Sequence, residues 1–123
     1  MISADFSWLS SGEMIKENIS NKEQPVKPFS YSVIKHSLMG LSKYFSEQLA
    51  PYGIRVNLLA PGGVWNNGLS DEFINKLTEQ VPMNRMANDN DYKGSIQFLC
   101  SDASSYMTGA NLSVDGGRTT GSI

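Results

Sequence analysis

The sequence has 123 residues, which is enough for one small domain and too short for two. Ten basic and twelve acidic residues give a net charge of -2, and neither a basic patch nor an acidic tail indicates a nucleic-acid partner. The N-terminus lacks a signal-peptide pattern, and the most apolar stretch, Ile54–Pro61, is too short to cross a bilayer, so we expect no membrane partner. The single cysteine, Cys100, excludes an internal disulfide, indicates a reducing, cytoplasmic compartment and is expected to be buried in a helix.

The first 29 residues are mostly polar and have little periodicity, so we expect an N-terminal segment of loop structure. From Ser30 the pattern changes, because apolar residues recur every three or four positions and predict one buried face of a long helix. These residues are Ile34, Leu38, Leu41, Phe45 and Leu49. Pro51 and Gly53 are expected to end this helix.

Two further elements are predicted after this helix. Residues Ile54–Ala60 form a nearly continuous apolar run, which is typical of a strand covered on both faces in a parallel sheet. The run Pro61-Gly62-Gly63 ends that strand. Ser70 is a suitable cap for a helix that continues to about Gln80.

The last third of the chain predicts one more helix and one more strand. Asn88 or Asp89 is expected to cap the helix, in which Tyr92, Ile96 and Leu99 share a face. A short strand is predicted over Asn111–Val114, closed by Asp115-Gly116-Gly117. The tail, residues 118–123, is small and polar, so we expect it to fray unless a partner holds it.

The predicted order is helix, strand, helix, helix, strand, which indicates an α/β fold. Two parallel strands joined by a helical crossover form a βαβ unit, but two strands are too few for a doubly wound sheet. The adjacent glycines of this sequence, Gly62-Gly63 and Gly116-Gly117, do not give a G-x-x-x-G-x-G pattern that opens a helix. We therefore expect half of the fold to be missing.

Tyr31 and Lys35 are the two residues whose side chains most clearly suggest a catalytic role. Four residues apart on a helix, they lie on the same face. An ammonium group close to a phenol favours the phenolate and so lowers the pKa of the phenol. Such a pair is suited to general acid/base chemistry that interconverts an alcohol and a carbonyl. The spacing alone is weak evidence, because any helix can carry it by chance.

Four motifs strengthen this interpretation, because they follow one another in a recognisable order between residues 29 and 117. They are Tyr31-Ser-Val-Ile-Lys35, then Leu-Ala-Pro-Tyr-Gly-Ile-Arg-Val-Asn57 with Ala-Pro-Gly-Gly-Val64, then Phe98-Leu-Cys-Ser-Asp-Ala-Ser-Ser-Tyr-Met-Thr-Gly109, and last Val114-Asp-Gly-Gly117. In this order they resemble the C-terminal half of a classical short-chain dehydrogenase/reductase. The resemblance implies that residues 30–117 are the C-terminal portion of a Rossmann-like, doubly wound parallel sheet.

The resemblance also implies a role for each motif. Tyr31 would be the catalytic acid/base, and Lys35 would lower its pKa and bind the ribose of NAD or NADP. The loop after the first strand would meet the nicotinamide through Pro61, Gly62, Gly63, Val64 and Asn66, with Asn66 standing where the family usually has a threonine. Trp65 and Asn67 would line the substrate side, although a tryptophan there is equally suited to packing. No group of residues has metal-ligand spacing, so no metal is expected.

The family's catalytic serine has two candidates in this sequence. Ser20, beside Asn18, lies about a dozen residues before Tyr31, but no predicted strand precedes it. If a longer insert precedes Tyr31, Met1-Ile2-Ser3 is the end of a strand and Ser3 is the catalytic serine. The sequence leaves this choice open.

Three interpretations of the whole chain follow. The first is part of an NAD(P)-dependent oxidoreductase that acts on a small carbonyl or alcohol substrate and is inactive on its own. The second is a non-catalytic oligomerisation module, because family members of this kind are expected to be homodimers or homotetramers. The third is a truncated remnant without function, which would show weak, uncooperative melting.

Overall fold

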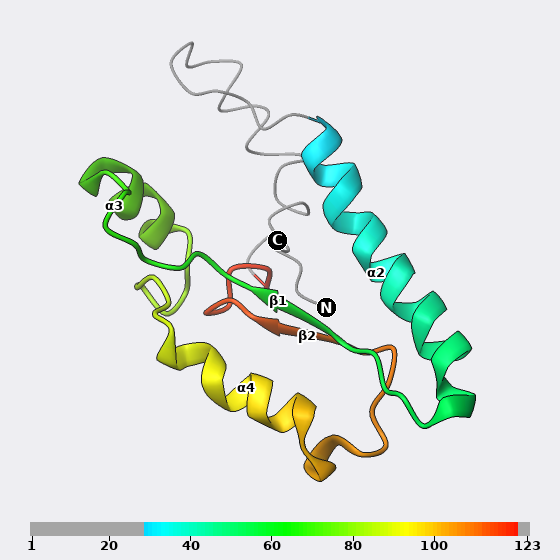
Figure 1. The fold of residues 1–123 in the computed structure, drawn as a ribbon. Helices are drawn as coiled ribbons and strands as arrows, with labels where there is room; N and C mark the ends of the chain where they lie inside the picture. Colours follow the sequence, from blue (N-terminus) through cyan, green and yellow to red (C-terminus); the bar gives the residue numbers. More distant parts are fainter. Residues whose placement is uncertain (1–28, 121–123) are drawn as a thin grey trace.

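The computed structural model describes residues 29–120, in which two parallel strands are flanked by helices (Figure 1). The predicted N-terminal segment, with Ser3, Asn18 and Ser20, lies outside these residues except for Phe29, which begins the first described helix. In chain order the elements are α2 (Phe29–Leu49), η3 (Ala50–Tyr52), β1 (Leu58–Pro61), α3 (Asp71–Glu79), α4 (Asn90–Cys100), η4 (Asp102–Ser104) and β2 (Asn111–Val114). The predicted α/β order of helix, strand, helix, helix, strand is confirmed.

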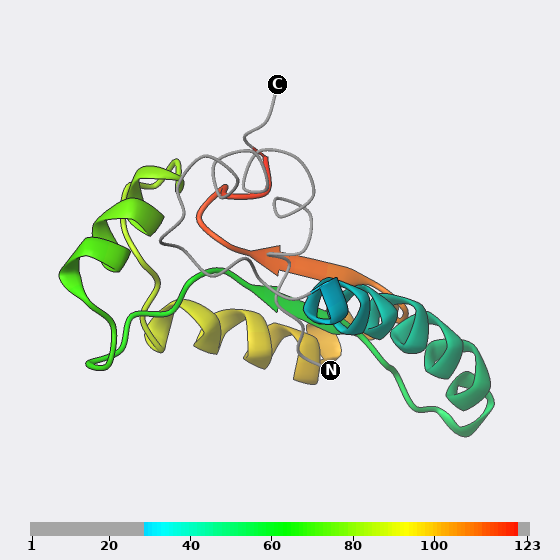
Figure 2. The same ribbon diagram turned by 90° about the horizontal axis from the view of Figure 1, so that it is seen from above.

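The two strands form one parallel pair, from Leu58 opposite Asn111 to Pro61 opposite Val114. Helix α4 packs against both strands, and α2 contacts β1. Figure 1 shows α2 on one side of the strand pair and α4 on the other. In Figures 1 and 2, α2 runs antiparallel to β1, so the first turns of α2 lie toward the carboxyl end of β1.

The buried side chains are concentrated on β1. Leu58 and Ala60 have no exposed surface, and Leu59 is 4% exposed. Such burial on both faces is what the predicted parallel strand requires. No helix among the described residues is long and apolar enough to span a membrane.

The buried face of α2 differs from the prediction. Ile34, Leu41 and Phe45 are exposed, and the buried residues of this helix are Ser42 and Ser46. A Cβ placed on Gly109 would lie 2.7 Å from the Ser46 hydroxyl oxygen, so the helix approaches the loop before β2 closely. Small side chains permit this approach, which bulky apolar side chains would prevent. Three of the five residues of the predicted stripe therefore face outward, while Leu38 and Leu49 are half-buried, so the prediction of a fully buried stripe was wrong.

The strand β1 is shorter than predicted, because residues 54–57 are held by the loop before β2 and not by a strand. The Val56 N–H donates to the hydroxyl of Thr108, and the Val56 carbonyl accepts from Gly109. The Asn57 side chain donates to the carbonyl of Met107 and accepts from the Ala110 N–H. These bonds hold residues 54–57 next to residues 107–110, just before the two strands begin to pair.

Arg55 connects the same region to the end of α4. Its guanidinium donates to the carbonyl oxygens of Leu99 at 2.9 Å, Ser101 at 3.3 Å and Met107 at 3.0 Å. Helix ends leave backbone carbonyls without partners inside the helix, and a cation with several donors is well suited to bind them. Arg55 therefore fixes the turn that brings the chain from α4 back to β2.

Polar side chains form hydrogen bonds with backbone N–H groups at the starts of α3 and α4. Ser70 accepts from the Phe73 N–H, so the predicted cap of α3 is confirmed. Before α4, the Asn88 side chain accepts from the Asn90 N–H, whereas Asp89 makes no capping hydrogen bond. Of the two predicted caps, the structure therefore favours Asn88.

Two predictions about the C-terminal part were wrong. Arg118 is only 4% exposed, and Thr119 donates through its N–H and its hydroxyl to Asp115, so residues 118–120 form an ordered turn and do not fray. Residues 121–123 of the predicted tail lie outside the described residues. Cys100 is exposed at the end of α4, because the buried side of that helix is the side that carries Tyr92.

Candidate active site

Tyr31 and Lys35 lie side by side in the first turns of α2. The Lys35 ammonium nitrogen is 5.6 Å from the centre of the Tyr31 ring, within the range of a cation–π contact. Both residues are half-buried. The helix therefore brings together the two residues predicted from the sequence to form the acid/base pair. They lie at the end of α2 that is toward the carboxyl end of β1 (Figure 1).

The loop after β1 is packed tightly through its two glycines. A Cβ on Gly62 would lie 2.7 Å from the Asp115 Cα, and one on Gly63 would lie 2.6 Å from a methyl group of Leu77. The Gly62 N–H donates to the Val114 carbonyl at 2.9 Å, which continues the strand ladder into the loop. The protein's own packing thus requires glycine at position 62, whether or not a ligand approaches.

A parallel bridge fixes the next part of the loop. The Ala87 N–H donates to the Gly63 carbonyl and the Trp65 N–H donates to the Ala87 carbonyl, both at 2.9 Å. In an extended backbone the peptide groups of successive residues alternate in direction. The N–H and C=O of Val64 therefore point to the side opposite Ala87, as one donor beside one acceptor.

The residues after Val64 form a turn at the surface. The side-chain oxygen of Asn66 accepts from the Gly68 N–H at 2.9 Å, so the side chain folds back on its own loop. Trp65 is 51% exposed, and Asn67 is also exposed. Among the described residues Trp65 is therefore about half-exposed.

An ion pair braces the segment that carries Ala87. The two terminal guanidinium nitrogens of Arg85 each donate to one carboxylate oxygen of Asp91 at 2.8 Å, and the Asn88 N–H donates to the same carboxylate at 2.8 Å. The hydrogen bonds from Arg85 and then from Asn88 lower the pKa of Asp91 to about 2. Asp91 therefore stays ionised at neutral pH, and its bonds to Arg85 and Asn88 hold the two ends of the segment 85–91, which contains Ala87, close together.

Tyr92 links the same segment to the first glycine of the loop. Its hydroxyl donates to the Gly62 carbonyl at 3.5 Å, and the side chain is 7% exposed. Burial raises the pKa of Tyr92, and the nearby carboxylates of Asp91 and Asp115 raise it further. The phenol therefore remains a hydrogen-bond donor at neutral pH.

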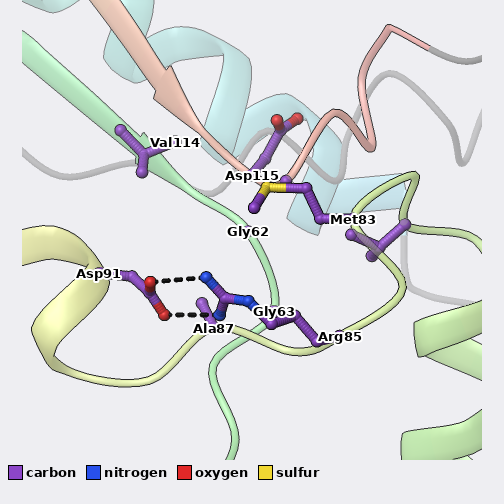
Figure 3. Close-up of a pocket in the computed structure, with 10 residues that line it drawn as sticks. Gly62, Gly63, Met83, Arg85, Ala87, Asp91, Val114 and Asp115 are labelled. Carbon is purple, nitrogen blue, oxygen red and sulfur yellow. Dashed lines mark hydrogen bonds and ion pairs between the residues drawn. The ribbon is translucent and has the colours of Figure 1, made fainter.

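A pocket of about 240 Å³ lies between the loop, the carboxyl ends of the strands and residues 81–91 (Figure 3). Its lining is mainly apolar, with the Arg85–Asp91 pair at one side (Figure 3). Asp115 also lines it, but its carboxylate accepts bonds from Gly117 and Thr119. Burial raises the pKa of Asp115 and these hydrogen bonds lower it, with a net shift downward.

The sequence analysis missed the segment from Arg85 to Asp91 as part of this site. The only signal was an arginine followed, six residues later, by an aspartate in the first turn of a predicted helix. Such a pattern does not reveal that Ala87 between them bonds to the loop after β1. Within residues 29–120, no cluster of three or more histidine, cysteine or acidic residues is arranged to hold a metal ion.

Comparison with known proteins identifies the family. A family model described as enoyl-(acyl carrier protein) reductase matches residues 13–119. Trans-4-hydroxycyclohexanecarboxylate dehydrogenase from Sinomonas cyclohexanicum is 42% identical over 95 residues, covering 75% of this chain and 35% of that protein. The 3-oxoacyl-(acyl-carrier-protein) reductase FabG of Staphylococcus epidermidis is 37% identical over 91 residues, covering 72% of this chain and 37% of that protein.

Solved structures show the same relationship. A short-chain dehydrogenase from Leptospira borgpetersenii with bound NAD+ superposes with a TM-score of 0.79 at 34% identity, covering 96% of this chain and 42% of that one. The chain belongs to the short-chain dehydrogenase/reductase family and corresponds to the C-terminal portion of its Rossmann-like fold. It spans about a third of the length of the curated relatives it matches, at 35% and 37% for the two named above.

Proposed function

We propose that this chain carries part of the active site of an NAD(P)-dependent oxidoreductase that interconverts an alcohol and a carbonyl in a small substrate. The observation that carries the proposal is the pair Tyr31 and Lys35 on α2, toward the same end of the sheet as the braced loop after β1. The relatives are named as reductases and dehydrogenases, which supports the same reaction class.

In this proposal Tyr31 donates and accepts the proton, and Lys35 stabilises the negative charge that forms on the Tyr31 oxygen. In the reducing direction the Tyr31 hydroxyl donates its proton to the substrate oxygen as that oxygen gains negative charge, and in the oxidising direction it takes the proton back. The ammonium of Lys35, next to the ring, stabilises the negative charge left on the Tyr31 oxygen. When bound, the nicotinamide supplies or accepts the hydride.

The loop after β1 fits the carboxamide of a nicotinamide. A carboxamide has one acceptor oxygen and an NH₂ donor, and the outward N–H and C=O of Val64 offer the complementary pair. Lys35 is the residue proposed to hold the ribose hydroxyls. The side chain of Asn66 retains its NH₂ group for a further contact, since its oxygen is bonded to Gly68.

We further propose that residues 1–123 bind a nicotinamide cofactor weakly and do not turn over a substrate alone. A dinucleotide site in an open α/β sheet also needs a glycine-rich turn that opens a helix, and this sequence contains none.

The test is a titration of the purified chain with NADH and with NADPH, followed by energy transfer from tryptophan to the nicotinamide. We expect saturable binding with a dissociation constant below about 1 mM. Lys35→Ala should weaken binding at least about threefold, and Lys43→Ala, an exposed lysine on the same helix, should leave it unchanged. A folded chain that binds neither nucleotide would contradict the weak binding proposed for residues 1–123 alone.

A second candidate function is homo-oligomerisation, favoured by the apolar side chains that α2 exposes. Val33, Ile34, Leu41 and Tyr44 are each more than two-fifths exposed, at 48%, 59%, 41% and 57%. An apolar stripe of this kind is unusual on a soluble monomer. In sedimentation experiments we expect a dimer or tetramer that Leu41→Glu dissociates and Lys43→Glu, at an exposed position on another side of the same helix, does not. A monomeric wild-type chain would contradict this function.

A further inference from the structure

We infer that Asp91 is a positioning residue for the nicotinamide-binding loop, although it lies in α4 and not in the loop. It acts through Arg85 and the backbone of Ala87, which hold Val64 in the orientation needed to bind the carboxamide. This inference rests on the proposed function and adds a residue outside the motifs from which that function was argued.

The first link is the closed segment from Arg85 to Asp91. Asp91 accepts two parallel bonds from Arg85 and one from the Asn88 N–H, all at 2.8 Å. Arg85 also donates to the Met86 carbonyl at 3.1 Å, so its guanidinium is held by two partners. The two parallel bonds between the planar guanidinium and the carboxylate set the relative orientation of the two groups, so this pair restricts the direction of the backbone between them.

The second link runs from this segment to the loop. Ala87 lies within the closed segment, and its N–H and C=O bond to Gly63 and Trp65, one residue on either side of Val64. Tyr92, the residue after Asp91, reaches the Gly62 carbonyl. Three of the four loop residues from Gly62 to Trp65 are therefore bonded to residues 85–92.

The third step concerns Val64 itself. Its peptide groups point away from Ala87, because its neighbours use theirs for the bridge. A donor and an acceptor held at fixed positions bind a ligand better than mobile ones, because less conformational entropy is lost on binding. Loosening the bridge at Ala87 thus weakens the ligand contact at Val64 without removing any group that touches the ligand.

The chain offers a matched control for a simple loss of an ion pair. Lys76 and Glu72 in α3 form an exposed pair at 2.9 Å, four residues apart within one helix. Exposed pairs of this kind add little to global stability. Glu72→Gln removes a carboxylate charge as Asp91→Asn does, and the Glu72 carboxylate accepts from Lys76 within α3.

The experiment measures backbone amide exchange and NADH affinity in the full 123-residue chain for wild type, Asp91→Asn, Arg85→Lys and Glu72→Gln. Asp91→Asn and Arg85→Lys should speed exchange at the Ala87 and Trp65 amides by about tenfold, with the Leu58 amide and the melting temperature nearly unchanged. Both should raise the dissociation constant for NADH at least about threefold. Glu72→Gln should change none of these quantities.

The outcomes separate this inference from the proposed function. If wild type binds NADH and the two variants exchange and bind as wild type does, the inference is overturned and the proposed function stands. If exchange at Leu58 rises with that at Ala87, Asp91 supports the whole fold, and the positioning role is again overturned. If wild type fails to bind NADH, the weak binding proposed for the isolated chain is contradicted, while the exchange result still decides whether Asp91 fixes the loop.

Discussion

Helix α2 and the loop after β1 supply the two halves of the proposed site, yet they are held in different ways. The loop is bonded on one side to β2 through Gly62 and on the other to Ala87. Helix α2 instead meets the strands along a narrow face of small side chains, Ser42 and Ser46, and exposes most of its apolar stripe. The residues proposed to position a cofactor are thus fixed within this part of the chain, whereas the proposed acid/base pair lies on a helix that meets the strands along a narrow face.

This difference indicates how the site depends on its surroundings. A backbone bridge is formed by residues close in the fold and needs no further partner. An exposed apolar helix face is stabilised when another surface covers it. We therefore expect the loop to keep its conformation in the isolated chain and the position of Tyr31 to depend on what covers α2.

The largest expected effect is at Gly62. Gly62→Ala places a methyl group 2.7 Å from the Asp115 backbone, which cannot move without separating β1 from β2. We expect a loss of about 3 kcal/mol in the free energy of unfolding, measured with urea. Gly63→Ala is the matched control, because the nearest atom is a flexible Leu77 methyl, and it should cost about 1 kcal/mol. Equal costs would show that the loop is not held against β2 as described.

Arg55 tests the connection between α4 and β2. Arg55→Ala removes three bonds to backbone carbonyls and should cost about 2 kcal/mol. Arg55→Lys keeps the charge but not the fork of donors, so it should recover less than half of that loss. Full recovery by lysine would mean that charge, and not the hydrogen-bond geometry, is what matters there.

Ser46 tests the narrow face of α2. Ser46→Leu adds bulk where the hydroxyl already lies 2.7 Å from the position of a Cβ on Gly109, and should cost about 2 kcal/mol or displace the helix. Ser37→Leu, at an exposed position of the same helix, should be nearly neutral. Similar melting temperatures for the two variants would place the packing face of α2 elsewhere.

The smallest expected effect is a pH dependence at Asp91. Its pKa of about 2 lies below the ordinary aspartate value of 3.8, so its contribution to stability is fully present above about pH 4 and is lost as the pH falls toward 2. Carboxyl-carbon NMR should report a midpoint near 2 for Asp91, and Arg85→Gln should move this midpoint upward. A midpoint near 4 in the wild-type chain would show that the pair with Arg85 does not form in solution.

The sequence predicted the elements better than the contacts between them. The limits of β2 and the cap at Ser70 followed from local signals, because turns and caps depend on neighbouring residues. The packing face of α2 did not, because an apolar stripe marks a surface that needs cover without saying what covers it. Likewise, the spacing of Tyr31 and Lys35 predicted their proximity, whereas the bridge between Val64 and Ala87 joins residues far apart in sequence.

The most direct test of the account is an NMR titration of the isotope-labelled chain with NADH, following backbone amides. We expect the Val64 N–H to shift most among the amides of residues 62–66, with the bonded amides of Trp65 and Ala87 moving little. Lys35→Ala should weaken this response, because the same ligand is proposed to contact both residues. Shifts confined to residues away from Val64 would contradict the central claim that the loop after β1 receives the nicotinamide.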